Sequence, residues 1–136
     1  MDTSNLKKFA QYARRSLIEQ VSAKLALVLA PDSLARRESV EAVSRLEEQI
    51  AAKDKAQVVE QVAYTWFNRF CALRYMDVKG YNRIRVLSPL PGQFQPEILA
   101  EAKGGYVDEQ VVKGPVRDHV FALLDGTTPS RKRIGY

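Results

Sequence analysis

Residues 55–79 read KAQVVEQVAYTWFNRFCALRYMDVK, and this stretch decides the fold class. Its apolar side chains recur at three- and four-residue steps and cover well over half of the circumference of a helix. A helix that is apolar on most sides is normally buried on most sides. We therefore expect a central helix that ends at Gly80 and places Trp66, Phe67 and Phe70 between its neighbours.

Two long helices are predicted before this segment and two short ones after it. Residues 4–29 carry an apolar stripe that is expected to face the core, made of Leu6, Phe9, Ala10, Ala13, Leu17, Val21 and Val28. Pro31 breaks that helix, and residues 34–52 form the next one. Beyond Gly80, prolines and glycines leave room only for helices at 96–103 and 115–125.

The expected fold is therefore mainly α. It is a compact helical bundle of three long helices and two short C-terminal helices, with little or no strand. Residues 1–126 are expected to form a single helical domain. Residues 127–136 are expected to form a basic C-terminal tail containing Arg131, Lys132 and Arg133.

Composition narrows the class of protein. The chain has 136 residues, a net charge of +5 and one cysteine. No stretch approaches the roughly 20 apolar residues of a membrane span, and charged residues interrupt the N-terminus, so we expect a cytoplasmic protein without a membrane partner. A structural zinc site takes four Cys or His ligands, whereas Cys71 and His119 supply two, so no metal is expected.

The same two residues are the obvious candidates for catalysis, and neither is in a catalytic setting. Cys71 lies within the apolar central segment, where we expect a small buried hydrophobe with an inert thiol. His119 is expected to be a surface or partly buried packing residue. The sequence has no glycine-rich phosphate loop, so the chain alone is not expected to be an enzyme.

Positive charge gathers on one ordered segment. Lys7, Lys8, Arg14 and Arg15 lie on the first predicted helix, away from its apolar stripe. Such a group is usually a solvated surface, and the alternative is a contact with the phosphates of DNA. These four residues are the candidate DNA-backbone contacts.

A second polar group lies on the central helix. Arg69 and Arg74 lie within or beside its apolar surface, and Asp77 follows Arg74 by three residues. The plain interpretation is a structural ion pair between Arg74 and Asp77. The alternative is a polar patch presented to another domain or to nucleic acid.

Several segments resemble one known family in collinear order. They are VAYTWFNRF at 62–70, ALRYMD at 72–77, LKKFA at 6–10, QPEILAEA at 95–102 and LLDG at 123–126. Together they are similar to the N-terminal region of the PglX-type adenine-specific DNA methyltransferases of BREX phage-defence systems.

The resemblance implies a role without catalysis. Members of that family transfer a methyl group from S-adenosylmethionine to N6 of adenine through an Asn-Pro-Pro-Tyr-type loop and a glycine-containing cofactor loop, and neither motif is present here. The chain then corresponds to a leading helical module with no cofactor of its own. It would act as a scaffold and docking domain for the catalytic region or for other defence proteins. The alternatives are a self-standing helical interaction protein and a free-standing DNA-binding protein.

Overall fold

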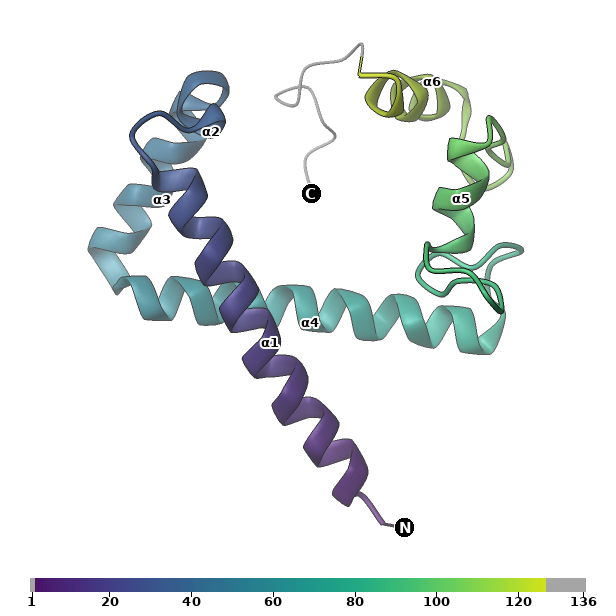
Figure 1. Cartoon of the computed structure of the whole chain (residues 1–136), viewed down its shortest axis with the longest axis horizontal. Coiled ribbons are helices and arrows are strands. Elements are labelled where there is room, and N and C mark those ends of the chain that lie inside the picture. The colour runs from purple at the N-terminus through teal and green to yellow at the C-terminus, as the bar shows by residue number, and fades with distance from the viewer. Residues whose placement is uncertain (1, 127–136) are drawn as a thin grey trace. The chain divides into compact units, whose positions relative to one another are not determined.

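The computed structural model describes residues 2–126, and these residues form six helices and no strand. In chain order the helices are α1 (Ser4–Leu29), α2 (Leu34–Glu38), α3 (Val40–Lys53), α4 (Lys55–Lys79), α5 (Glu97–Lys103) and α6 (Gly114–Leu124) (Figure 1). The predicted mainly α fold class is confirmed. None of the described helices is both long enough and apolar enough to cross a membrane.

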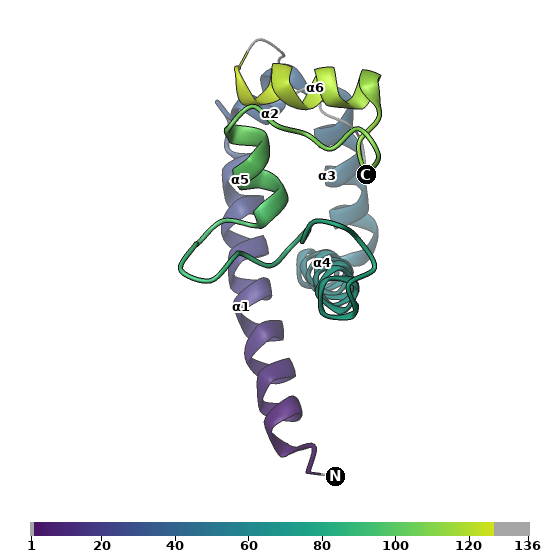
Figure 2. The ribbon, with the colours of Figure 1, turned by 90° about the vertical axis from the view of Figure 1, so that its right-hand side faces the viewer.

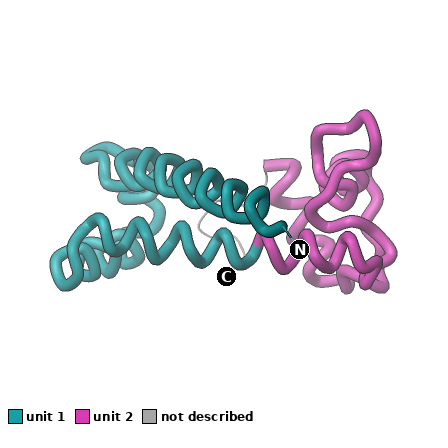
Figure 3. The backbone as a smooth tube through the Cα atoms, turned by 90° about the horizontal axis from the view of Figure 1, so that it is seen from below, with its two compact units in different colours: residues 1–69 teal, residues 70–136 magenta. Residues whose placement is uncertain are grey.

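The chain divides into two compact units, and α4 contributes to both of them. Unit 1 comprises Met1–Arg69 and unit 2 comprises Phe70–Tyr136 (Figure 3). The expectation of a single domain over residues 1–126 stays a prediction. The expected basic tail at 127–136 lies outside the described residues.

Unit 1 is organised by the crossing of α1 over the first part of α4 (Figure 1). The buried side chains near this crossing are Leu25 of α1 and Val58, Val59 and Ala63 of α4. Three of the four are small or β-branched, so each buries only a limited apolar surface. The crossing therefore buries a narrow core.

The prediction that α4 is buried on most sides is wrong. Trp66 and Phe67 are half-buried, Phe70 is 39% exposed, and Cys71, expected to be buried, is exposed. Helical periodicity identifies the residues that share a face, but it does not say how many neighbours cover the helix. In unit 1, α1 covers one side of α4 and contacts its small residues.

The predicted core face of α1 is wrong at its start. Leu6 is 66% exposed and Phe9 is 56% exposed, whereas Leu17, Val21 and Val28 are at least half-buried. The crossing with α4 covers the later turns of α1 and leaves the first turns uncovered. The apolar stripe therefore extends beyond the packed part of the helix, and its first residues are exposed to solvent.

The helix predicted over 34–52 is divided in two at Ser39, whose φ of −134° and ψ of 53° are not helical. The short helix before this break is held by Arg36. The side chain of Ser33 accepts from the Arg36 N–H, and the Arg36 guanidinium donates to the carbonyl of Leu29 at 2.9 Å and to Glu47 at 2.6 Å. Arg36 therefore satisfies the open end of α1 and ties it to α3.

Unit 2 begins with the end of α4 and continues through a long connection into α5 and α6 (Figure 2). Gly80 has a φ of +66°, which glycine adopts without steric cost, and it ends α4 as predicted. The buried residues of this unit lie in the connections and in α5: Ile84, Ser88, Ala102 and Val107.

Candidate functional site

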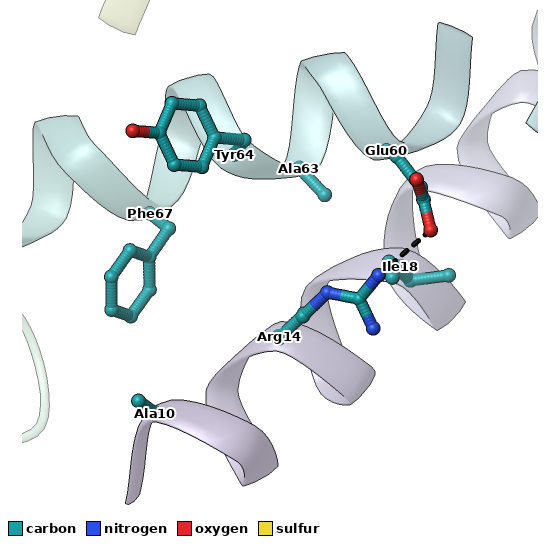
Figure 4. Close-up of a pocket in the computed structure, with 7 residues that line it drawn as sticks. All are labelled: Ala10, Arg14, Ile18, Glu60, Ala63, Tyr64 and Phe67. Atoms are coloured by element: carbon teal, nitrogen blue, oxygen red, sulfur yellow. Dashed lines mark hydrogen bonds and ion pairs between the residues drawn. The ribbon is translucent and has the colours of Figure 1, made fainter. Parts of the chain in front are cut away.

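An apolar groove lies between α1 and α4 within unit 1, and Figure 4 shows its lining side chains. Its volume is about 230 Å³. The residues that line it are Ala10, Arg14 and Ile18 from α1, and Glu60, Ala63, Tyr64 and Phe67 from α4. Ala10 and Ala63 have only a methyl group each, so the space between the helices is left open there.

The uncovered first turns of α1 precede the part of the helix that lines the groove. Phe9 and Leu6 lie about one and two turns before Ala13 on the α1 stripe, and Tyr64 is 68% exposed on the α4 side. We call Leu6, Phe9, Ala10, Tyr64 and Phe67 the docking face. Apolar side chains beside a groove are a feature that helix-in-groove interfaces share.

The four candidate DNA contacts do not have equivalent surroundings. Nη2 of Arg14 lies 2.7 Å from Oε1 of Glu60, so Arg14 pairs across the groove with α4 (Figure 4). Lys7, Lys8 and Arg15 are exposed on α1. Because both partners of the Arg14–Glu60 pair are exposed, it contributes at most about 1 kcal/mol to stability.

A second groove lies where the later turns of α1 meet α4, also within unit 1. It has a volume of about 200 Å³ and includes Leu25, Val62 and Trp66 in its wall. The guanidinium carbon of Arg69 lies 5.1 Å from the centre of the Trp66 ring, a cation–π distance. Arg69 thus contacts an aromatic residue of unit 1.

Arg74 and Asp77 have their partners in the connection that follows α4. The Asp77 carboxylate accepts the backbone N–H groups of Val86 at 2.8 Å, Leu87 at 2.9 Å and Ser88 at 2.7 Å. Nη1 of Arg74 donates to the hydroxyl of Ser88 at 2.5 Å. Both residues therefore fix residues 86–88 against α4, and we call this arrangement the Asp77 clamp.

The clamp also sets the charge state of Asp77. Burial alone would raise the pKa of this carboxyl. The N–H groups of Val86, Leu87 and Ser88 and the hydroxyl of Ser88 favour the ionised form, so the pKa of Asp77 lies below its usual value. A periodic pattern could not have revealed this role, since the acceptor and its three donors belong to different elements.

The residues weighed for catalysis do not form a site. Cys71 is exposed on α4, and His119 is half-buried on α6. Within residues 2–126, no group of three or more His, Cys, Asp or Glu side chains is placed to hold a metal ion.

The described chain is thus a helical region with an open apolar groove and an exposed basic helix. Its sequence is similar to those of two curated proteins. It is similar to the adenine-specific methyltransferase PglX of Lacticaseibacillus casei (strain Zhang), 35% identical over 147 residues and covering 80% of this chain. It is also similar to the adenine-specific methyltransferase BrxX of Escherichia coli O9:H4 (strain HS), 34% identical over 112 residues and covering 65% of this chain.

The predicted resemblance is confirmed, and the chain contains a PglX/BrxX-like region. The chain spans only 12% and 9% of the lengths of these two relatives. No family model matches the sequence, and no solved structure matches it.

Replacing Asp77 with Asn tests the clamp. Asn has one acceptor oxygen for three N–H groups, so we expect the free energy of unfolding at pH 7 to fall by about 1–3 kcal/mol. Because folding lowers the pKa of Asp77, its stabilising effect is complete above the unfolded-state pKa of about 3.9 and is lost as the pH falls towards the folded-state pKa. The difference between wild type and Asp77→Asn should therefore shrink below about pH 4.

Urea unfolding at a series of pH values measures this difference. Asp118→Asn, at an exposed position of unit 2, is the matched control and should leave the stability nearly unchanged. An Asp77→Asn effect that is equal at pH 7 and at pH 2–3 would contradict the role of the ionised carboxylate.

Proposed function

We propose that this chain is the N-terminal, non-catalytic helical module of a BREX-type adenine-specific (N6) DNA methyltransferase that acts in bacterial phage defence in the cytoplasm. Similarity to PglX and BrxX over most of the chain supports the enzyme class. The catalytic and S-adenosylmethionine-binding motifs are absent from this sequence, so those functions would belong to another region of the enzyme.

The module's role in this proposal is that of a scaffold and docking domain. The observation that carries it is the docking face, where Leu6 and Phe9 continue the core stripe of α1 and yet remain more than half exposed. Covering them would bury apolar surface worth about 25 cal/mol per Å². The partner in this proposal is the catalytic region of the methyltransferase, with other defence proteins as the alternative.

Contact with the DNA backbone is the second part of the proposal. Residues 4–18 contain Lys7, Lys8, Arg14 and Arg15 and no acidic residue. Basic side chains on an exposed helix position a duplex through its phosphates without reading its sequence. Arg14 would exchange Glu60 for a phosphate.

The polar residues of α4 have a supporting role in this proposal. Arg69 contacts Trp66, and Arg74 and Asp77 hold the connection after α4. They would maintain the shape of the module, and the docking face would bind the partner. The alternative function, a self-standing interaction or DNA-binding protein of phage defence, requires a stable complex that forms without any methyltransferase.

A binding experiment tests the docking role. The chain is mixed with the Lacticaseibacillus casei relative from which the matching region has been removed, and complex formation is measured by calorimetry and light scattering. We expect binding that weakens about tenfold or more in Leu6→Gln/Phe9→Gln, because buried apolar anchors carry much of the energy of an interface.

The matched control is Leu27→Gln/Leu34→Gln, which changes two exposed leucines outside the docking face. This variant should bind as wild type does. No complex, or equal loss in both variants, would count against docking through α1.

A salt titration tests the DNA contact. Replacing Lys7, Lys8, Arg14 and Arg15 with Gln should reduce the salt dependence of duplex binding, because each phosphate contact releases counterions. Fluorescence anisotropy across about 50–200 mM salt gives the slope. The control replaces Lys24, Arg37, Lys53 and Lys55, which changes the net charge equally, and an unchanged slope in the first variant would remove α1 from DNA binding.

A further inference from the structure

The connection between α4 and α5 projects as a loop from unit 2 (Figure 2). It carries a fully exposed phenylalanine. A turn forms where the N–H of Gln93 donates to the carbonyl of Leu90 at 2.9 Å, with Gly92 at a φ of +80°. Phe94 follows this turn directly, and its whole side chain faces solvent. The flanking residues, Gln93 and Gln95, are exposed as well.

The base of this loop is firmly held. The Asp77 clamp fixes residues 86–88, the N–H of Arg85 donates to Glu97 at 3.2 Å, and the N–H of Ile98 donates to the carbonyl of Arg85 at 3.1 Å. The two ends of the loop are thereby joined to each other. Binding to a side chain on such a loop loses little conformational freedom, which favours affinity.

The charged side chains within the loop segment are all positive, whereas the carboxylates that hold its base belong to the flanking helices. Residues 78–96 contain Lys79, Arg83 and Arg85 and no acidic residue. Arg83 lies 3.8 Å from Asp108, so its charge is partly balanced, whereas Lys79 and Arg85 are exposed. These two cations present positive charge to solvent, and such charge attracts the phosphates of an anionic ligand.

Further exposed aromatic rings lie at the start of the loop. Tyr75 and Tyr81 contact each other edge to face with ring centres 6.0 Å apart, and Nζ of Lys79 lies 5.7 Å from the Tyr75 ring. Both tyrosines are more than half exposed. Aromatic rings interleaved with cations are typical of surfaces that bind single-stranded nucleic acid, because rings stack on bases while cations hold phosphates.

We propose that this loop binds unpaired DNA: Phe94 stacks on an exposed base, and Lys79 and Arg85 contact the adjacent phosphates. The inference rests on the proposed function, in which DNA is the ligand of the whole enzyme. An unpaired strand fits better than a duplex, since bases within a duplex already stack on one another. A ring on an exposed loop can stack on a base whose face is open, as it is in a single strand.

The test measures binding of the whole 136-residue chain to a short oligothymidine strand by fluorescence anisotropy. Phe94→Ala should weaken binding about tenfold, the size of one lost base–ring stack, and Phe94→Trp should retain it. Tyr106→Ala removes another exposed aromatic of unit 2 outside the loop and should have no effect.

A spectroscopic measurement separates stacking from a change in folding. In Trp66→Phe/Phe94→Trp, the remaining indole should be quenched by the oligothymidine strand and not by an abasic strand of equal charge. Equal affinity of wild type and Phe94→Ala, or equal quenching by both strands, would overturn the proposal.

These experiments distinguish failure of the loop proposal from failure of the proposed function. If substitution of the four basic residues of α1 abolishes DNA binding while Phe94→Ala does not, the loop proposal is wrong and the DNA contact of α1 stands. If Phe94→Ala weakens binding to the methyltransferase relative and leaves oligothymidine binding intact, the loop binds protein and the proposal is overturned.

Discussion

The crossing of α1 over α4 is the contact on which unit 1 depends. Leu25, Val58, Val59 and Ala63 are all at most 7% exposed there. The same contact limits the core, because large aromatic residues remain beside it and are only half-buried. The later turns of α1 are therefore packed, whereas the apolar residues of its first turns are exposed.

In unit 2, a long connection without helix or strand is held in place by hydrogen bonds to one carboxylate. Three successive N–H groups of residues 86–88 donate to one carboxylate, which satisfies backbone donors that burial would otherwise leave unpaired. The pKa of Asp77 is lowered as a consequence. Stability and presentation are linked here, since the carboxylate that orders the connection also fixes the root of the loop that displays Phe94.

The features that could be predicted from the sequence are the helix bounds, because they depend on residues that are close along the chain. Helical periodicity and Gly80 placed α4 at 55–79, as observed, and the short helices after it were predicted to within one residue at each end. Features set by distant residues could not be predicted. They are the exposure of Leu6 and Phe9, the hydrogen bonds of Arg36 to other helices, and the amides that bind Asp77. Periodicity shows that Leu6 belongs to a stripe, but only the crossing point decides whether anything covers it.

The central claim is that α1 is anchored by its later turns and is free at its first turns. Amide hydrogen exchange of the isolated chain measures this directly, because helices without tertiary packing are marginal in water. The account predicts slow exchange over residues 20–29 and exchange faster by orders of magnitude over residues 5–13, with protection of the latter when a docking partner is added. Uniform slow exchange along the whole of α1 in the isolated chain would contradict it.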